Sequence, residues 1–165
     1  MKLRHSFIVL AVLSALTLAQ PSKPAGVVDK DDLQKLIPST YFYRGQSATV
    51  QLRNSAAIRT KDQKYILAGL VDTAGYASDV AQKYQGLLIT EVKLKIGGSE
   101  LAPGEYGMGF VGDKFVVTDV GANEVLSVSA KRDDNLRGPV PLRIVEEGGA
   151  YRLYAGRKYV TLETE

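Results

Sequence analysis

The chain has 165 residues, of which 45% are hydrophobic and 24% are charged, and 21 Lys and Arg against 18 Asp and Glu give a formal net charge of +3. It contains no cysteine and a single histidine, His5. This composition is typical of a folded globular protein, and it excludes disulfides, thiol nucleophiles and the cysteine class of zinc sites.

The first 19 residues have the pattern of a cleavable export signal. Lys2 and Arg4 form a positive head, residues 7–19 are almost wholly apolar, and Thr17 and Ala19 place small residues at the −3 and −1 positions. An apolar run of this length is too short to span a bilayer, so we predict a signal peptide rather than a retained anchor. We therefore expect a secreted or periplasmic protein that has no membrane span after cleavage.

Cleavage after Ala19 would change the chemistry of the mature chain. It would remove His5, the only imidazole, and it would lower the formal net charge from +3 to +1, since Lys2 and Arg4 are the only charged residues in this segment. A nearly neutral surface predicts no nucleic-acid partner, because phosphate contacts need clustered positive charge. We assign no catalytic residue and expect no metal site and no cofactor.

Residues 20–28 read as a flexible, Pro-containing leader, and one short helix is predicted after it, over residues 28–37. Asp29 can cap this helix, Val28 and Leu33 can form a hydrophobic staple, and Pro38 stops it.

From Tyr41 onward the hydrophobic period changes to two. Apolar and polar residues alternate over 92–96, 126–130, 140–144 and 160–163, and the denser apolar runs at 65–72 and 114–120 predict central strands. Turn sequences rich in Gly, Pro, Asn and Asp separate these runs. The pattern predicts an all-β fold, an antiparallel β-sandwich or small barrel, as a single β-rich domain over residues 29–165.

Glycines recur at positions 104, 107, 109 and 112, a spacing that resembles a phosphate-binding loop. Such a loop leads directly into a helix, whereas here a strand is predicted to follow at 114–120. We therefore expect these glycines to permit a bulge, a bend or the close approach of another backbone.

Tyrosine gives the most suggestive functional signal, since the chain has nine Tyr and no Trp, and several stand beside arginine. Tyr and Arg dominate binding hot spots. The candidate binding residues are Tyr41, Tyr43, Arg44, Tyr151, Arg152 and Tyr154. The alternative is structural, because tyrosine is a good strand former whose ring packs in a core with its hydroxyl at the rim.

Three acidic residues are the candidates for carboxylate chemistry. Asp72, Glu105 and Asp119 each interrupt or end an apolar strand. A buried acid needs a partner, and Arg59 or Arg152 could supply one structurally.

The stretch "VKLKIGGSELAPGEYGMGFVGDKFVVTDV" places a Gly-Gly turn and a Leu-Ala-Pro-Gly-Glu-Tyr-Gly element between two apolar strands. With "YFYRGQSATVQLRNSAAIRT", "LAGLVDTAGY" and "GPVPLRIVEEGGAYRLYAGRKYV", it resembles uncharacterised secreted bacterial proteins that are small β-domains of unknown function. The likeness covers most of residues 40–162 and implies export and a β fold. The resemblance implies no functional-site residues.

The sequence thus favours an exported, non-catalytic domain for binding or assembly in the bacterial envelope or outside the cell, with a protein or glycan of the cell envelope as its partner. A carboxylate-based enzyme acting on glycans is the alternative, and it would need an acid of raised pKa in a cleft. A third hypothesis is a small-ligand carrier, which would need an enclosed apolar cavity.

Overall fold

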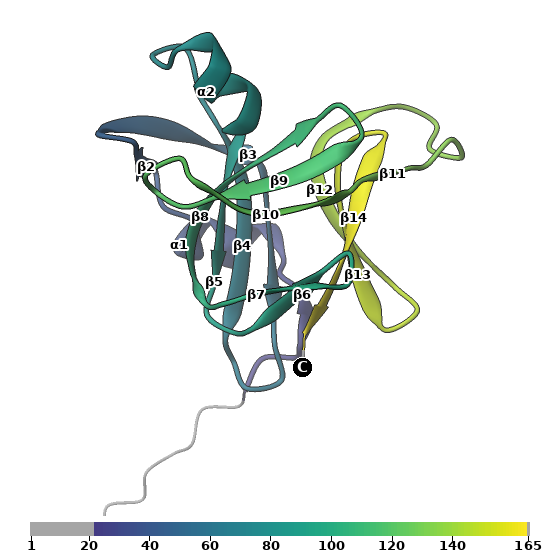
Figure 1. Ribbon diagram of the computed structural model, residues 1–165. Helices are drawn as coiled ribbons and strands as arrows, with labels where there is room; N and C mark the ends of the chain where they lie inside the picture. Colours follow the sequence, from purple (N-terminus) through teal and green to yellow (C-terminus); the bar gives the residue numbers. More distant parts are fainter. Residues whose placement is uncertain (1–21, 165) are drawn as a thin grey trace, which may run out of the picture.

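The computed structural model describes residues 22–164 as two antiparallel sheets with two short helices (Figure 1). One sheet has eight strands: β1 (Gly26–Val27), β3 (Gln46–Arg59), β4 (Tyr65–Val71), β5 (Gly86–Thr90), β8 (Gly104–Val111), β9 (Lys114–Thr118) and β10 (Glu124–Ser129) in that order, with β2 (Thr40–Tyr43) paired to β3. The other runs β12 (Val140–Glu147), β13 (Ala150–Gly156), β14 (Lys158–Thr164), β6 (Leu94–Ile96) and β7 (Ser99–Leu101), with β11 (Lys131–Arg132) paired to β14. The predicted signal peptide lies outside the described residues.

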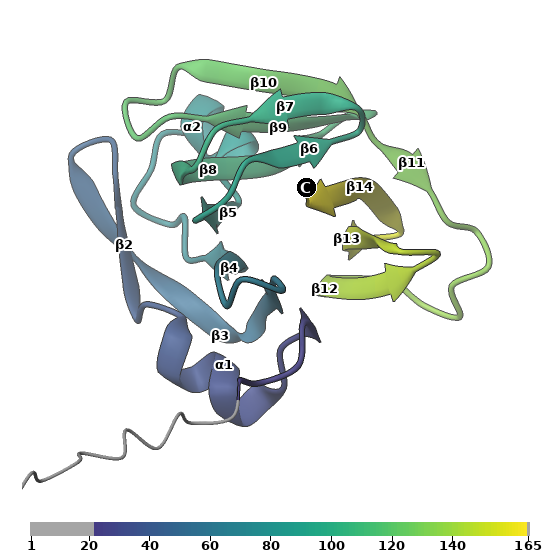
Figure 2. The same cartoon turned by 90° about the horizontal axis from the view of Figure 1, so that it is seen from below.

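The two sheets face each other and approach along both edges, where β12 contacts β3 and β7 contacts β10. Seen from below, the strands surround a common interior (Figure 2). The predicted all-β sandwich is therefore confirmed, and the dense apolar runs form β4 and β9, which each have a strand on both sides.

The interior is filled by side chains from both sheets, as the period of two predicts. Strand β14 contributes Val160 and Leu162, and β6 contributes Leu94 and Ile96, with the polar residues between them turned outward. The most deeply buried members of this core are Ile58, Ile66, Ala68, Leu88, Leu94, Ile96, Phe115, Val117, Leu153 and Leu162.

The predicted helix is present as α1 (Lys30–Leu36). The Asp29 carboxylate accepts a hydrogen bond from the backbone N–H of Asp32 at 2.9 Å, which caps the first turn. Val28 and Leu33 lie in one apolar cluster with Ala57 and Leu67, so the staple also anchors α1 to the eight-stranded sheet.

The leader is held more firmly than its composition suggests. Gly26 and Val27 pair with Arg59 and Ile58 as β1, and the carbonyl of Lys23 accepts a hydrogen bond from the Gln63 side chain at 2.9 Å. From Lys23 onward the expected flexible segment is therefore part of the fold, because backbone pairing outweighs its polar composition.

A second helix, α2 (Ser78–Lys83), is not predicted by the sequence. It has six residues and no side-chain cap, so its local signal is weak. A Cβ at Gly109 of β8 would collide with the backbone carbonyl of Lys83, so the glycine allows α2 to lie on the sheet. Of the four glycines, Gly109 thus allows the close approach of another backbone, one of the three predicted roles. Within residues 22–164, neither helix has the length and apolarity that a membrane crossing requires.

Candidate functional site

The first group of candidate tyrosines lies in the protein interior. Tyr41 and Tyr43 project from β2 into a cluster with Tyr76 and Tyr84. The rings of Tyr43 and Tyr84 stack with centroids 3.8 Å apart, and Tyr76 meets Tyr84 edge-on at 5.1 Å. Because Tyr41 and Tyr43 are buried, the prediction that they are exposed binding contacts is corrected: the structural alternative, a ring packed in the core, describes them.

The hydroxyls of this tyrosine cluster differ in their partners. Tyr43 shares a hydrogen bond of 2.6 Å with Thr118 Oγ1, and Tyr76 donates to the carbonyls of Tyr43 and Gln46. The hydroxyls of Tyr41 and Tyr84 are buried and have no hydrogen-bond partner among the described residues. Burial is the main cause that raises the pKa of Tyr41 and Tyr84 far above the usual range, so both stay neutral in the folded protein.

We expect Tyr41→Phe to raise the free energy of unfolding by about 1 kcal/mol, because it removes a buried hydroxyl that lacks a partner. Tyr43→Phe is the matched control, and it should lower that free energy by a similar amount, since Thr118 loses its hydrogen bond. Urea unfolding of the two variants measures both effects. A Tyr41→Phe variant less stable than the original would show that the hydroxyl has a partner after all.

The second group of candidates lies on β13, and its members face opposite ways. Tyr154 is only 3% exposed: its hydroxyl donates to Asp133 at 2.9 Å, and Arg143 covers its ring at 5.5 Å. The Arg152 guanidinium stacks over Tyr159 at 4.5 Å and pairs with Glu147. Tyr154 and Arg152 therefore form part of a layer that stiffens the outer face of the six-stranded sheet, whereas Tyr151 points toward the core side.

The three candidate acids do not converge. Asp72 and Glu105 are exposed, and Asp72 accepts a hydrogen bond from the N–H of Ala74 in its own turn. Asp119 holds the β9–β10 turn, and hydrogen bonds from Asn123 lower the pKa of its carboxyl. A general acid needs the opposite shift. Both arginines proposed as structural partners do pair with acids, but Arg59 pairs with Asp32 and Arg152 pairs with Glu147.

The larger of two hollows lined by candidate binding residues is bordered in part by the β3–β4 turn, which Figure 1 draws at its lower end near the C-terminus. This mouth pocket has a volume of about 570 Å³. It lies between the β3–β4 turn, the β12–β13 hairpin, the leader and the end of β14, and its lining includes Arg59, Lys61, Asp62, Glu146, Tyr151 and Thr164.

The wall of the mouth pocket is anchored to the rest of the fold. Tyr151 and Val92 pack against the main core. Arg59 is 5% exposed and is held by Asp32 at 3.1 Å and by the hydroxyl of Tyr65 at 3.3 Å. By contrast, Lys61 and Asp62 are exposed residues of the β3–β4 turn. The pocket therefore combines a buried, hydrogen-bonded Arg59 with exposed charged side chains.

Of the residues around the mouth pocket, the sequence identified only Tyr151 as a binding candidate. Lys61 and Asp62 belong to a polar turn, and Glu146 lies in a hairpin 84 residues after Asp62. They become neighbours only through the pairing of β14 with β6 and the contact of β12 with β3. The charged residues of these turns were the only other sign of the mouth pocket in the sequence. A single sequence does not show which turns lie at the same end of a sandwich.

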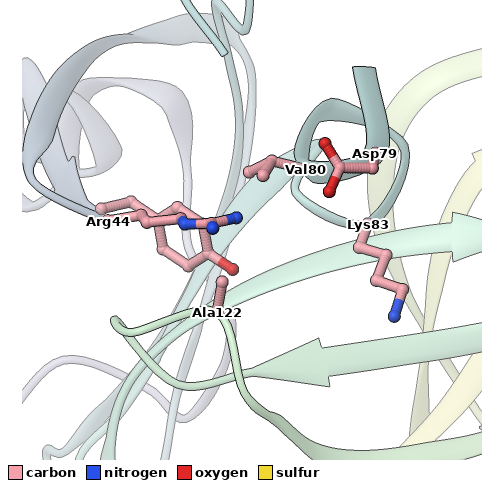
Figure 3. Close-up of a pocket in the computed structure, with 6 residues that line it drawn as sticks. Arg44, Asp79, Val80, Lys83 and Ala122 are labelled. Atoms are coloured by element: carbon pink, nitrogen blue, oxygen red, sulfur yellow. The ribbon is translucent and has the colours of Figure 1, made fainter. Parts of the chain in front are cut away.

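A smaller hollow lies at the other end of the eight-stranded sheet. This hairpin pocket has a volume of about 140 Å³ and is lined by Tyr43, Arg44, Asp79, Val80, Lys83 and Ala122. Figure 3 shows Arg44 reaching in from the β2–β3 turn, with Val80, Asp79 and Lys83 on α2 opposite and Ala122 below the Arg44 side chain. Of the candidate binding residues Tyr41, Tyr43 and Arg44, only Arg44 is exposed.

Within the described part of the chain, no group of three or more His, Cys, Asp or Glu residues is placed to hold a metal ion. No protein-family model, no curated protein sequence and no solved structure matches this chain. Its function therefore has to be inferred from its own geometry.

Proposed function

We propose that this protein is an exported, non-catalytic binding domain that holds a polar ligand in the mouth pocket. The observation that carries the proposal is the pocket itself. Its volume of about 570 Å³ falls within the range of about 300–1,000 Å³ that is usual for ligand sites, and several polar groups converge on it. The apolar start of the chain, residues 7–19, supports export.

The lining indicates the kind of ligand. Lys61 supplies a positive charge, Asp62 and Glu146 supply negative charges, and Thr164 supplies a hydroxyl. Tyr151 adds a ring against which a sugar or a side chain can lie. This mixture suits a short glycan or peptide segment with many hydrogen-bonding groups. It suits an apolar ligand poorly, and the apolar interior is occupied by the packed core.

We expect Lys61→Met and Glu146→Gln to weaken ligand capture about tenfold each, since each removes a charged contact without touching the core. The mature protein is incubated with envelope extract, and the captured glycan and peptide fractions are quantified separately. Lys114→Met, at an exposed position on β9 outside the mouth pocket, is the matched control and should bind normally.

Circular dichroism should show the same fold in all variants. Equal capture by the pocket variants and the control would contradict the proposal. Recovery of a cleaved glycan, with cleavage lost in Glu146→Gln, would favour the carboxylate enzyme instead.

A further inference from the structure

A third hollow lies where α1 rests against β3 (Figure 2). Its volume of about 430 Å³ falls within the range of about 300–1,000 Å³ that is usual for small-ligand sites. This α1 groove shares no lining residue with the mouth pocket or the hairpin pocket, so it is a separate site. It is lined by Lys30, Leu33, Gln34, Leu52, Arg53 and Ser55.

The β3 wall of the α1 groove is a wide bulge in the strand. From Val50 to Ser55, β3 advances five residues while its partner β4 advances two, so three residues of β3 are additional. The Ser55 hydroxyl donates a hydrogen bond of 2.9 Å to the Gln51 carbonyl and closes the bulge. Leu52 and Arg53 lie between these two residues and line the groove opposite α1. Bulges often redirect side chains in this way beside functional sites.

Two leucines give the α1 groove an apolar part. Leu33 of α1 is 5% exposed and belongs to the cluster that anchors the helix to the sheet, and Leu52 is 39% exposed on the bulge. None of the six lining residues is aromatic, so the groove offers no ring on which a sugar or a base can stack. The leucines therefore favour an aliphatic ligand.

The charge of the α1 groove is positive. Lys30 and Arg53 are exposed, and neither takes part in any ion pair among residues 22–164. The other two polar residues of the lining, Gln34 and Ser55, are neutral. Strand β3 and its partners β1, β2 and β4 contain no Asp or Glu. The sheet side of the groove thus supplies no negative charge.

The acidic residues of α1 and its cap do not line the groove either. The Asp29 carboxylate accepts the N–H of Asp32 as the helix cap, and the Asp32 carboxylate is held by Arg59 at 3.1 Å. Asp31 is exposed and forms no ion pair with Lys30. The groove therefore presents two unpaired cations beside apolar surface, which is complementary to an anion that carries an aliphatic chain.

We propose that the α1 groove binds a small amphiphilic carboxylate, whose anionic group lies between Lys30 and Arg53 and whose aliphatic chain lies on Leu33 and Leu52. The guanidinium of Arg53 can hold a carboxylate through two parallel hydrogen bonds, and Lys30 adds a second positive charge. Exposed charges alone hold a free anion weakly, so burial of the chain must contribute to the affinity. Binding should consequently depend on both parts of the ligand.

The test titrates octanoate into the 15N-labelled mature protein. The backbone amides of Lys30, Leu52 and Arg53 should shift along one saturable curve. Butyrate has the same carboxylate and a shorter chain, whereas octylammonium has the same chain and the opposite charge. Each should bind at least about tenfold more weakly than octanoate.

Variants assign the two parts of the ligand to residues. Lys30→Gln and Arg53→Gln should each raise the apparent Kd for octanoate at least about fivefold, and both positions are exposed, so the fold should persist. Leu52→Ser should bring the affinities for octanoate and butyrate closer together, because it removes apolar contact only. Arg137→Gln, at an exposed position in another loop, is the matched control and should bind octanoate normally.

Four results would overturn the assignment. The first is the absence of saturable octanoate binding, and the second is equal binding of octanoate and octylammonium, which would mean apolar adsorption without selection for charge. The third is unchanged binding in both Lys30→Gln and Arg53→Gln. The fourth is a set of amide shifts confined to the mouth pocket, around Lys61 and Glu146, which would leave the function proposed for that pocket standing.

Discussion

Replacing Gly107 by alanine is expected to lower the free energy of unfolding by about 3 kcal/mol, because the buried tyrosine cluster leaves no room for a methyl group. A Cβ at this position of β8 would lie 2.6 Å from Cε2 of Tyr43, 2.8 Å from Oγ1 of Thr118 and 3.0 Å from Cδ2 of Tyr84. The rings of Tyr43 and Tyr84 are stacked and fully buried, so neither can move without disturbing the other. Thr118 is held in turn by its hydrogen bond to Tyr43.

Gly138→Ala is the matched control for Gly107→Ala. No heavy atom lies within 4 Å of the position that its Cβ would occupy, and its φ is not positive, so stability should change by no more than about 0.5 kcal/mol. Chemical denaturation of both variants measures the difference. If Gly107→Ala were as stable as Gly138→Ala, the tyrosine cluster would be more loosely packed than described.

Replacing Asp32 by asparagine is expected to lower the melting temperature at neutral pH by roughly 10 °C, because it leaves the guanidinium of Arg59 buried without a carboxylate. Asp32 accepts hydrogen bonds from Lys23 and from Arg59, the latter at 3.1 Å, and Lys35 lies 3.6 Å away. The hydrogen bond from Lys23, with the charges of its basic neighbours, outweighs the effect of burial and lowers the pKa of Asp32 below its ordinary value of 3.8.

The direction of this shift determines its pH dependence. A lowered pKa in the folded state stabilises the protein above pH 3.8, and that stabilisation is lost as the pH falls through the folded-state pKa. The melting temperatures of Asp32→Asn and the original protein should therefore converge below about pH 3.8. If the difference between the two melting temperatures stayed constant at acidic pH, the charge of Asp32 would not be what stabilises the fold.

Two comparisons isolate this ion pair. Glu100→Gln breaks the exposed pair with Lys93, whose atoms lie 3.7 Å apart, and it should change the melting temperature by no more than about 2 °C. The double variant Asp32→Asn/Arg59→Gln should lose less stability than the sum of the single losses, since the two side chains interact directly. Additive losses would show that Asp32 and Arg59 act independently.

Most of the fold could be predicted from local patterns. Alternation such as Leu94-Lys95-Ile96 shows which side chains enter the core, and Asp29 with Val28 marks the start of α1. Helix α2 could not be predicted, because it has six residues and no side-chain cap, and it lies on the sheet through a close approach to Gly109 in a distant strand. The order of strands depends on contacts between distant segments, such as β14 with β6, which leave no mark in one sequence.

The candidate sites were less predictable than the fold. Tyrosine next to arginine drew attention to the β2–β3 hairpin, but alternation along β2 turns Tyr41 and Tyr43 inward and leaves Phe42 outside. The turn that follows then exposes Arg44, whose positive φ cannot be predicted from the sequence. Side-chain direction in a short strand depends on register, and register is set by the partner strand.

The pairing of β14 with β6 also determines the order in which the molecule can be completed. Strands β12–β14 lie between Val140 and Thr164, whereas β6 and β7 lie between Leu94 and Leu101. In a growing polypeptide Leu94 and Ile96 therefore lack their partner strand until β14 has been synthesised. Chains truncated before Val160 would leave this apolar surface exposed, and we expect them to aggregate rather than to fold as shorter domains.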